Sequence, residues 1–133
     1  MLIKWNDKYN VGNPIIDEQH QKLIQIAQKA NGILHQQTFD KYEEVRAVLD
    51  ELKDYTRFHF ETEEQIMLQG NFSNYIAHKK LHDEFLFEIE EMISKVYDDL
   101  TDNTIRAILN FLVEWLIGHI YGNDKNMVLE ITK

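Results

Sequence analysis

Apolar residues recur at intervals of three and four along four long segments of the chain, which is the spacing of one face of an α-helix. We expect these helices at about residues 17–37, 41–69, 74–98 and 103–122. Short connections join them, so each helix must run antiparallel to the one before it. The sequence therefore predicts an all-α fold, an up-down-up-down antiparallel four-helix bundle.

Single residues mark the ends of the expected helices. Asp40 precedes the second helix and forms a capping-box-like pair with Glu43, three residues later. Gly70 is placed to end that helix as its C′ residue, and Gly122 is placed to end the fourth helix.

One domain accounts for the whole chain, because 133 residues is an ordinary length for a single domain. We expect this domain to span residues 1–133. Residues 1–15 show no helical repeat and would form an irregular N-terminal arm. The bundle would take residues 16–122, and residues 123–133 would form a short C-terminal tail.

Five histidines and two acidic residues are expected to face the interior of this bundle near one of its ends. His59 and Glu63 are four residues apart, as are His78 and His82, so each pair shares one helix face. The start of the first and third helices meets the end of the second and fourth, which places the whole set at a similar depth. Its members are His20, His59, Glu63, His78, His82, His119 and Asp124.

Asp124 joins this set only if the backbone departs from α-helical geometry. It follows His119 by five residues, a rotation of about 140° away from it on a regular helix. We expect an irregularity there, either a left-handed residue at Gly122 or Asn123 or a single π-type turn.

The chemistry of the set points to metal ions. Burying the carboxylates of Glu63 and Asp124 without partners would cost several kcal/mol, so bound cations are expected. Seven ligands are too many for one tetrahedral zinc and suit two metals bridged by the carboxylates. Ligands rich in imidazole and free of thiolate favour iron, copper, zinc or nickel. Glu61 and Glu64 point off the face of His59, and we expect them to be solvated charges.

Composition narrows the possible functions. The chain has no cysteine, which excludes disulfides, thiolate nucleophiles and iron–sulfur clusters. A net charge of −9 makes nucleic acid and anionic membranes poor partners. We find no signal peptide and no apolar run of about 20 residues, so we expect a cytoplasmic protein, and a monomer. A ferritin-like ferroxidase is disfavoured because no histidine follows a glutamate by three residues, whereas a di-zinc hydrolase stays possible in principle.

Four motifs give the chain a family resemblance. Residues 16–20, 59–64, 78–82 and 115–120, followed by Asp124, resemble the hemerythrins, and the single-domain bacterial members above all. The resemblance implies a non-haem centre of two oxo- or hydroxo-bridged iron ions per chain.

The resemblance also implies a role for each member of the set. His78, His82 and His119 would bind one iron, and His20 and His59 would bind the other, which keeps an open position. Glu63 and Asp124 would bridge the two irons.

Reversible dioxygen binding for carriage, storage or sensing is the function that the resemblance implies, without catalysis. An enzyme of the oxidase, peroxidase or nitric-oxide-handling type is the alternative. By family analogy the dioxygen pocket is lined by apolar residues that flank the ligands, namely Leu23, Phe60, Trp115, Leu116 and Ile120.

Overall fold

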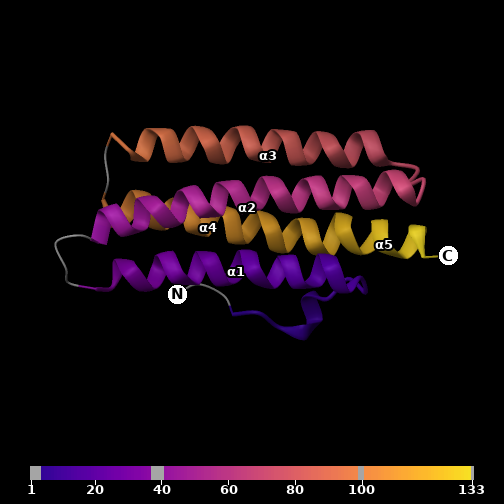
Figure 1. Cartoon of the computed structure of the whole chain (residues 1–133), viewed down its shortest axis with the longest axis horizontal. Coiled ribbons are helices and arrows are strands. Elements are labelled where there is room, and N and C mark those ends of the chain that lie inside the picture. Colours follow the sequence, from indigo (N-terminus) through magenta and orange to yellow (C-terminus); the bar gives the residue numbers. More distant parts are fainter. Residues whose placement is uncertain (1–3, 37–40, 99–100, 133) are drawn as a thin grey trace.

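The computed structural model of the chain describes residues 4–36, 41–98 and 101–132. Its long helices run back and forth along one axis, and each lies beside two others (Figure 1). They are α1 (Pro14–Leu34), α2 (Lys41–Gln69), α3 (Tyr75–Val96) and α4 (Asp102–His119). The predicted up-down-up-down four-helix bundle is confirmed. The capping pair expected at Asp40 lies outside the described residues. α1 ends at Leu34, so the helix end expected at about residue 37 was wrong.

One apolar core fills the space between the four helices. Fully buried side chains come from every helix, including Leu23 of α1, Leu49 and Phe60 of α2, Ile89 of α3 and Leu112 of α4. Burying a side chain of this size stabilises the fold by about 1.5–3 kcal/mol. The helices of the described residues lack the combination of length and apolar composition that a membrane crossing requires.

α1 begins at Pro14, so the start expected at Asp17 was wrong. The Asn13 side chain accepts hydrogen bonds from two N–H groups of the first turn, and a proline fits the first helical position because its missing N–H is not needed there. The Asp17 carboxylate instead accepts the N–H of Val11 at 2.7 Å and that of Gly12 at 3.3 Å. Gly12 has a φ of 100°, a conformation that glycine adopts without strain.

The end of α2 differs from the expectation for Gly70. Asn71, not Gly70, takes the left-handed conformation, with a φ of 53°, and the N–H of Phe72 donates to the carbonyl of Met67 at 2.9 Å. This is the hydrogen bond of a Schellman motif with Asn71 as its C′ residue. Gly70 serves a different need, because a Cβ there would lie 2.9 Å from the side chain of Ile131.

The fourth helix does not end at Gly122, so the expected helix end and the expected tail were wrong. One turn of π-helix, η2 (Ile120–Asp124), leads directly into a further helix, α5 (Lys125–Ile131), which carries the chain on from α4 (Figure 1). Met127 and Val128 are buried, and this apolar contact keeps the chain helical beyond Gly122.

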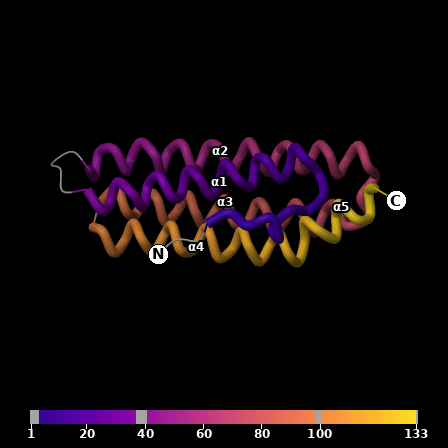
Figure 2. Tube along the Cα trace, turned by 90° about the horizontal axis from the view of Figure 1, so that it is seen from below, coloured from indigo at the N-terminus to yellow at the C-terminus, as the bar shows by residue number. Residues whose placement is uncertain are grey.

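α5 ties the end of the bundle to two other segments. The Glu130 carboxylate accepts hydrogen bonds from the Ser73 N–H at 2.7 Å and from its hydroxyl at 2.6 Å. Lys125 donates to the backbone carbonyl of Lys8 at 3.0 Å. Lys8 lies in a short 3₁₀ turn, η1 (Asp7–Tyr9), of the N-terminal arm, which runs lengthwise along this side of the bundle (Figure 2). The segment that the sequence left as a tail therefore closes one end of the molecule.

The Gly70 contact has a measurable consequence for stability. We expect Gly70→Ala to lower the free energy of unfolding by about 1 kcal/mol, because the new methyl group would press on the branched Cβ of Ile131. Gly32→Ala is the matched control. It lies in α1 with no atom within 4 Å of the added Cβ, and should raise the free energy by about 0.5–1 kcal/mol. Urea unfolding of both variants measures the difference, and equal gains in both would contradict close packing of α5.

Candidate metal centre

The structure brings all seven predicted side chains together at one end of the bundle. Each is buried, with an exposed fraction of 0–3%. α1 contributes one member, α2 and α3 contribute two each, α4 contributes one, and η2 contributes the last. In that order they are His20, His59 and Glu63, His78 and His82, His119, and Asp124.

The π turn is the device that brings Asp124 into the group. In η2 the N–H of Lys125 donates to the carbonyl of Ile120, five residues earlier. This wider turn returns Asp124 to the side of His119, whose Nε2 lies 3.0 Å from Asp124 Oδ1. The predicted irregularity is confirmed, and of the two forms considered it is the π-type turn. Single π turns of this kind are frequent at functional sites.

Three histidines form one half of the centre. The Nε2 atom of His119 lies 3.0 Å from Nε2 of His78 and 3.1 Å from Nε2 of His82. A single proton on His119 cannot serve both neighbours, so hydrogen bonding does not explain the arrangement. Metal–imidazole bonds of about 2.1 Å at right angles would hold two nitrogens about 3.0 Å apart. Both distances from His119 thus match those between neighbouring ligands on one six-coordinate ion.

Two histidines form the other half, and Glu63 lies between the halves. Its Oε2 atom is 2.7 Å from Nε2 of His59 and 3.3 Å from Nε2 of His20. Its Oε1 atom is 3.1 Å from Nε2 of His82 and 3.5 Å from Nε2 of His78. Each carboxylate oxygen of Glu63 therefore faces a different histidine group.

Asp124, which lies in η2, also directs its two oxygens to different histidine groups. Its Oδ2 atom lies 3.1 Å from Nε2 of His20, while its Oδ1 atom lies 3.1 Å from Nε2 of His78 and 3.0 Å from that of His119. The two-histidine group with one oxygen from each carboxylate makes a four-donor set, and the three-histidine group with the other oxygens makes a five-donor set.

Several of these buried atoms lack hydrogen bonds. Within the described part of the chain, His59 Nε2, Glu63 Oε1 and both carboxylate oxygens of Asp124 have no hydrogen-bond partner. Their contacts with the surrounding nitrogens are close, but the angles are not those of hydrogen bonds. Leaving buried polar atoms unpaired costs about 1–3 kcal/mol each, and more where they are charged. Bound cations would satisfy these atoms, so the residues present fit a pair of metal ions.

The charges of the group are strongly coupled. Burial opposes protonation of His20, but the nearby Asp124 and Glu63 outweigh it and raise the pKa of His20 to about 9. The same balance raises the pKa of His78 to about 9, whereas burial dominates at His59 and lowers its pKa. Burial would raise the pKa of Glu63 and Asp124, but the surrounding histidines hold both below their ordinary values. Without metal, both carboxylates are thus ionised, and His20 and His78 carry protons at neutral pH.

Two further side chains contact the Nδ1 atoms of histidines, on the side of the ring that faces away from the centre. Gln19 Oε1 accepts the Nδ1–H of His59 at 2.8 Å, and Glu64 Oε2 accepts the Nδ1–H of His82 at 3.0 Å. Glu64 was expected to be a solvated charge, and that was wrong, because it points from α2 toward α3 and only 14% of its side chain is exposed. Sequence reasoning missed both residues. The sequence did offer a signal for both, because Gln19 directly precedes His20 and Glu64 directly follows Glu63.

The five apolar residues expected to line a dioxygen pocket lie in or beside the core. Phe60 stacks on His82 with ring centroids 3.9 Å apart, and Trp115 stacks on His119 at 4.4 Å. Phe60 is buried and Trp115 partly exposed. The remaining three are also buried, namely Leu23, Leu116 and Ile120. Both aromatic rings thus pack against the three-histidine group.

Comparison with known proteins agrees with this geometry. The family model described as the hemerythrin HHE cation binding domain matches residues 11–129. A bacteriohemerythrin of Clostridium acetobutylicum is 33% identical over 128 residues, which cover 96% of this chain and 99% of that protein. A hemerythrin-like protein of Naegleria gruberi is 31% identical over 121 residues, 90% of this chain and 86% of that protein.

A crystal structure of wild-type hemerythrin shares the fold. It superposes with a TM-score of 0.84 over 100% of both chains, at 23% sequence identity. The relatives named above match nearly the full length, and the family model spans most of the chain. This chain therefore belongs to the hemerythrin family of HHE cation-binding domains.

Proposed function

We propose that this protein holds two iron ions and binds dioxygen reversibly through them, for carriage, storage or sensing. One observation carries the proposal: Glu63 and Asp124 each direct one oxygen to the two-histidine group and the other to the three-histidine group. That arrangement suits carboxylates that bridge two cations, whereas a single cation would not need both oxygens of each carboxylate. The choice of iron rests on family membership and on the affinity of imidazole and carboxylate for such metals.

The unequal donor sets define where dioxygen would enter. With a bridging solvent oxygen, the five-donor set around His78, His82 and His119 reaches six ligands, while the four-donor set around His20 and His59 reaches five. The open position would therefore belong to the ion held by His20 and His59. When bound, the ferrous ions would supply both that position and the electrons that dioxygen takes up.

The surrounding side chains would keep the reaction reversible. Leu23, Phe60, Leu116 and Ile120 are at most 2% exposed and present no hydrogen-bonding side-chain groups. Such a wall excludes bulk water and the protons that would release reduced oxygen. The carboxylates and imidazoles would balance the charge of the metal ions, so the role of the apolar residues would be to exclude water.

We expect the purified protein to bind two iron ions per chain, and Glu63→Ala to bind one at most. The variant removes one oxygen from each donor set, so both ions lose a ligand and their common bridge. Iron content after anaerobic loading with Fe(II) measures the result. Glu61→Ala is the control, because Glu61 lies two residues away on the exposed surface of α2 and should leave two ions bound. Full loading of Glu63→Ala would refute the bridging role.

Reversibility separates a carrier from an enzyme. Admitting air to the ferrous protein should produce a visible absorption band that disappears under vacuum and returns with air over repeated cycles. The apolar wall is the physical reason, since it would keep water and protons away from the centre. Absorption spectra recorded through the cycles provide the measurement. Irreversible oxidation with release of peroxide in the first cycle would favour an oxidase or peroxidase instead.

Metal removal should make stability depend on pH in a defined direction. The protons on His20 and His78 stabilise the metal-free fold fully below pH 6.5, and this stabilisation is lost as the pH rises through about 9. We expect the melting temperature of chelator-treated protein to fall by about 5 °C or more between pH 6 and pH 9.5. The iron-loaded protein is the control and should show no such fall, because cations replace these protons. Equal stability of the chelated protein at both pH values would contradict the charge assignment.

A further inference from the structure

One histidine in each group is held from behind, and the two holding groups differ in charge. His59 of the two-histidine group donates its Nδ1–H to the amide oxygen of Gln19 at 2.8 Å. His82 of the three-histidine group donates its Nδ1–H to the carboxylate of Glu64 at 3.0 Å. In both cases the hydrogen bond fixes the proton on Nδ1 and leaves Nε2 facing the centre.

The amide partner is part of a neutral chain of hydrogen bonds. The side chain of Gln19 is buried between α1 and α2, and its Nε2 donates to the hydroxyl of Thr62 at 3.3 Å. Thr62 in turn donates to the backbone carbonyl of Phe58 at 3.0 Å. This chain orients Gln19 so that its oxygen faces His59, and no ionised group takes part in it.

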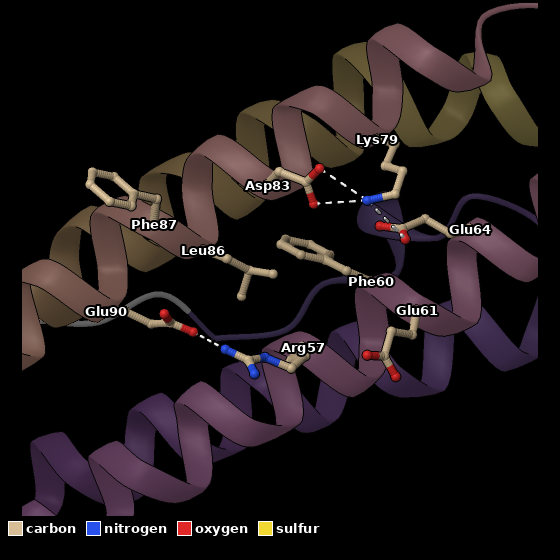
Figure 3. Close-up of a pocket in the computed structure, with 9 residues that line it drawn as sticks. All are labelled: Arg57, Phe60, Glu61, Glu64, Lys79, Asp83, Leu86, Phe87 and Glu90. Carbon is tan, nitrogen blue, oxygen red and sulfur yellow. Dashed lines mark hydrogen bonds and ion pairs between the residues drawn. The ribbon is translucent and has the colours of Figure 1, made fainter.

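The carboxylate partner lies at the edge of a surface groove. A groove of about 320 Å³ runs between α2 and α3, with Phe60 and Glu64 among its lining residues (Figure 3). Lys79 lies between Glu64 and Asp83, at 3.9 Å from the former and 3.0 Å from the latter. Lys79 therefore pairs mainly with Asp83 and neutralises little of the charge on Glu64. The Glu64 carboxylate thus faces His82 as a negative group.

A negative partner changes an imidazole ligand more than a neutral one does. A carboxylate that accepts the Nδ1–H bond pushes electron density toward Nε2 and makes that nitrogen a stronger ligand, whereas an amide mainly orients the ring. Loss of such a partner typically weakens metal binding by about 10- to 100-fold. Glu64 therefore strengthens the group that already has more donors.

We propose that Gln19 and Glu64 are positioning residues that make the two halves of the centre unequal in metal affinity. Glu64 strengthens the three-histidine group, which takes its metal first and releases it last. Gln19 orients His59 without added charge, which leaves the two-histidine group as the weaker half. This inference rests on the proposed function, since it requires that both groups hold a metal.

Stepwise loading with Co(II) tests the inference without dioxygen chemistry. Metal-free protein is titrated with Co(II) in the presence of a competing chelator, and the visible absorption of bound cobalt reports each step. The wild type should bind two ions in two separate steps. Glu64→Gln keeps an oxygen that can accept the His82 hydrogen bond, as Gln19 does for His59, and removes only the charge. It should weaken the first step by about 10-fold or more and leave the second step unchanged.

Two further variants complete the design. Glu61→Gln removes a charge from the same groove without a contact to a histidine in the described residues, and should titrate as the wild type does. Gln19→Glu gives His59 a charged partner and should strengthen the second step. The thermal melt of each metal-free variant shows that it folds, so a change confined to one binding step cannot be a general loss of structure.

The outcomes distinguish this inference from the proposed function. Wild-type protein that fails to bind two ions per chain overturns both. Two bound ions with a Glu64→Gln titration like that of the wild type, or with both steps weakened equally, overturns the positioning role alone. Binding of both ions in a single unresolved step by the wild type also overturns it, because the halves would then be equal.

Discussion

Burial of two carboxylates among five imidazoles is the constraint on which the rest of this structure depends. Glu63 and Asp124 are completely buried, and several of their oxygens have no hydrogen-bond partner in the described residues. Such atoms destabilise a fold unless positive charge is placed beside them. Protons on the histidines supply that charge in the metal-free protein, and two cations would supply more of it with better geometry. The same buried carboxylates that are costly without positive charge beside them therefore favour the binding of cations.

The backbone is shaped to meet this constraint. A regular helix would carry Asp124 away from His119, and η2 corrects the rotation with one wide turn. A π turn is less favourable than a regular α-helix, so it needs support from the packing of the residues that follow it. α5 provides it, with Met127 buried, Glu130 bound to Ser73 and Ile131 packed against Gly70. The apparent tail is thus a structural part of the site.

The two halves of the centre have different surroundings. Phe60 and Trp115 stack on histidines of the three-histidine group, and Glu64 holds one of these from a solvent-facing groove. The two-histidine group has the neutral Gln19 as its partner instead. That half has fewer donors and no charged support, and it is the half where the proposed function places dioxygen. The asymmetry of the outer contacts thus follows the asymmetry of the ligands themselves.

The sequence by itself determined the helices, their order and the seven side chains at one end, because helical periodicity and the spacing of four between ligands are local properties. It also required an irregularity before Asp124. Only the tertiary structure decided that Gly70 must lack a side chain beside Ile131, and that the chain stays helical past Gly122, where Met127 is buried. It also decided that Glu64 serves His82. Each of these depends on a contact between residues far apart in the chain, and for Glu64 the sequence offered only its position beside Glu63.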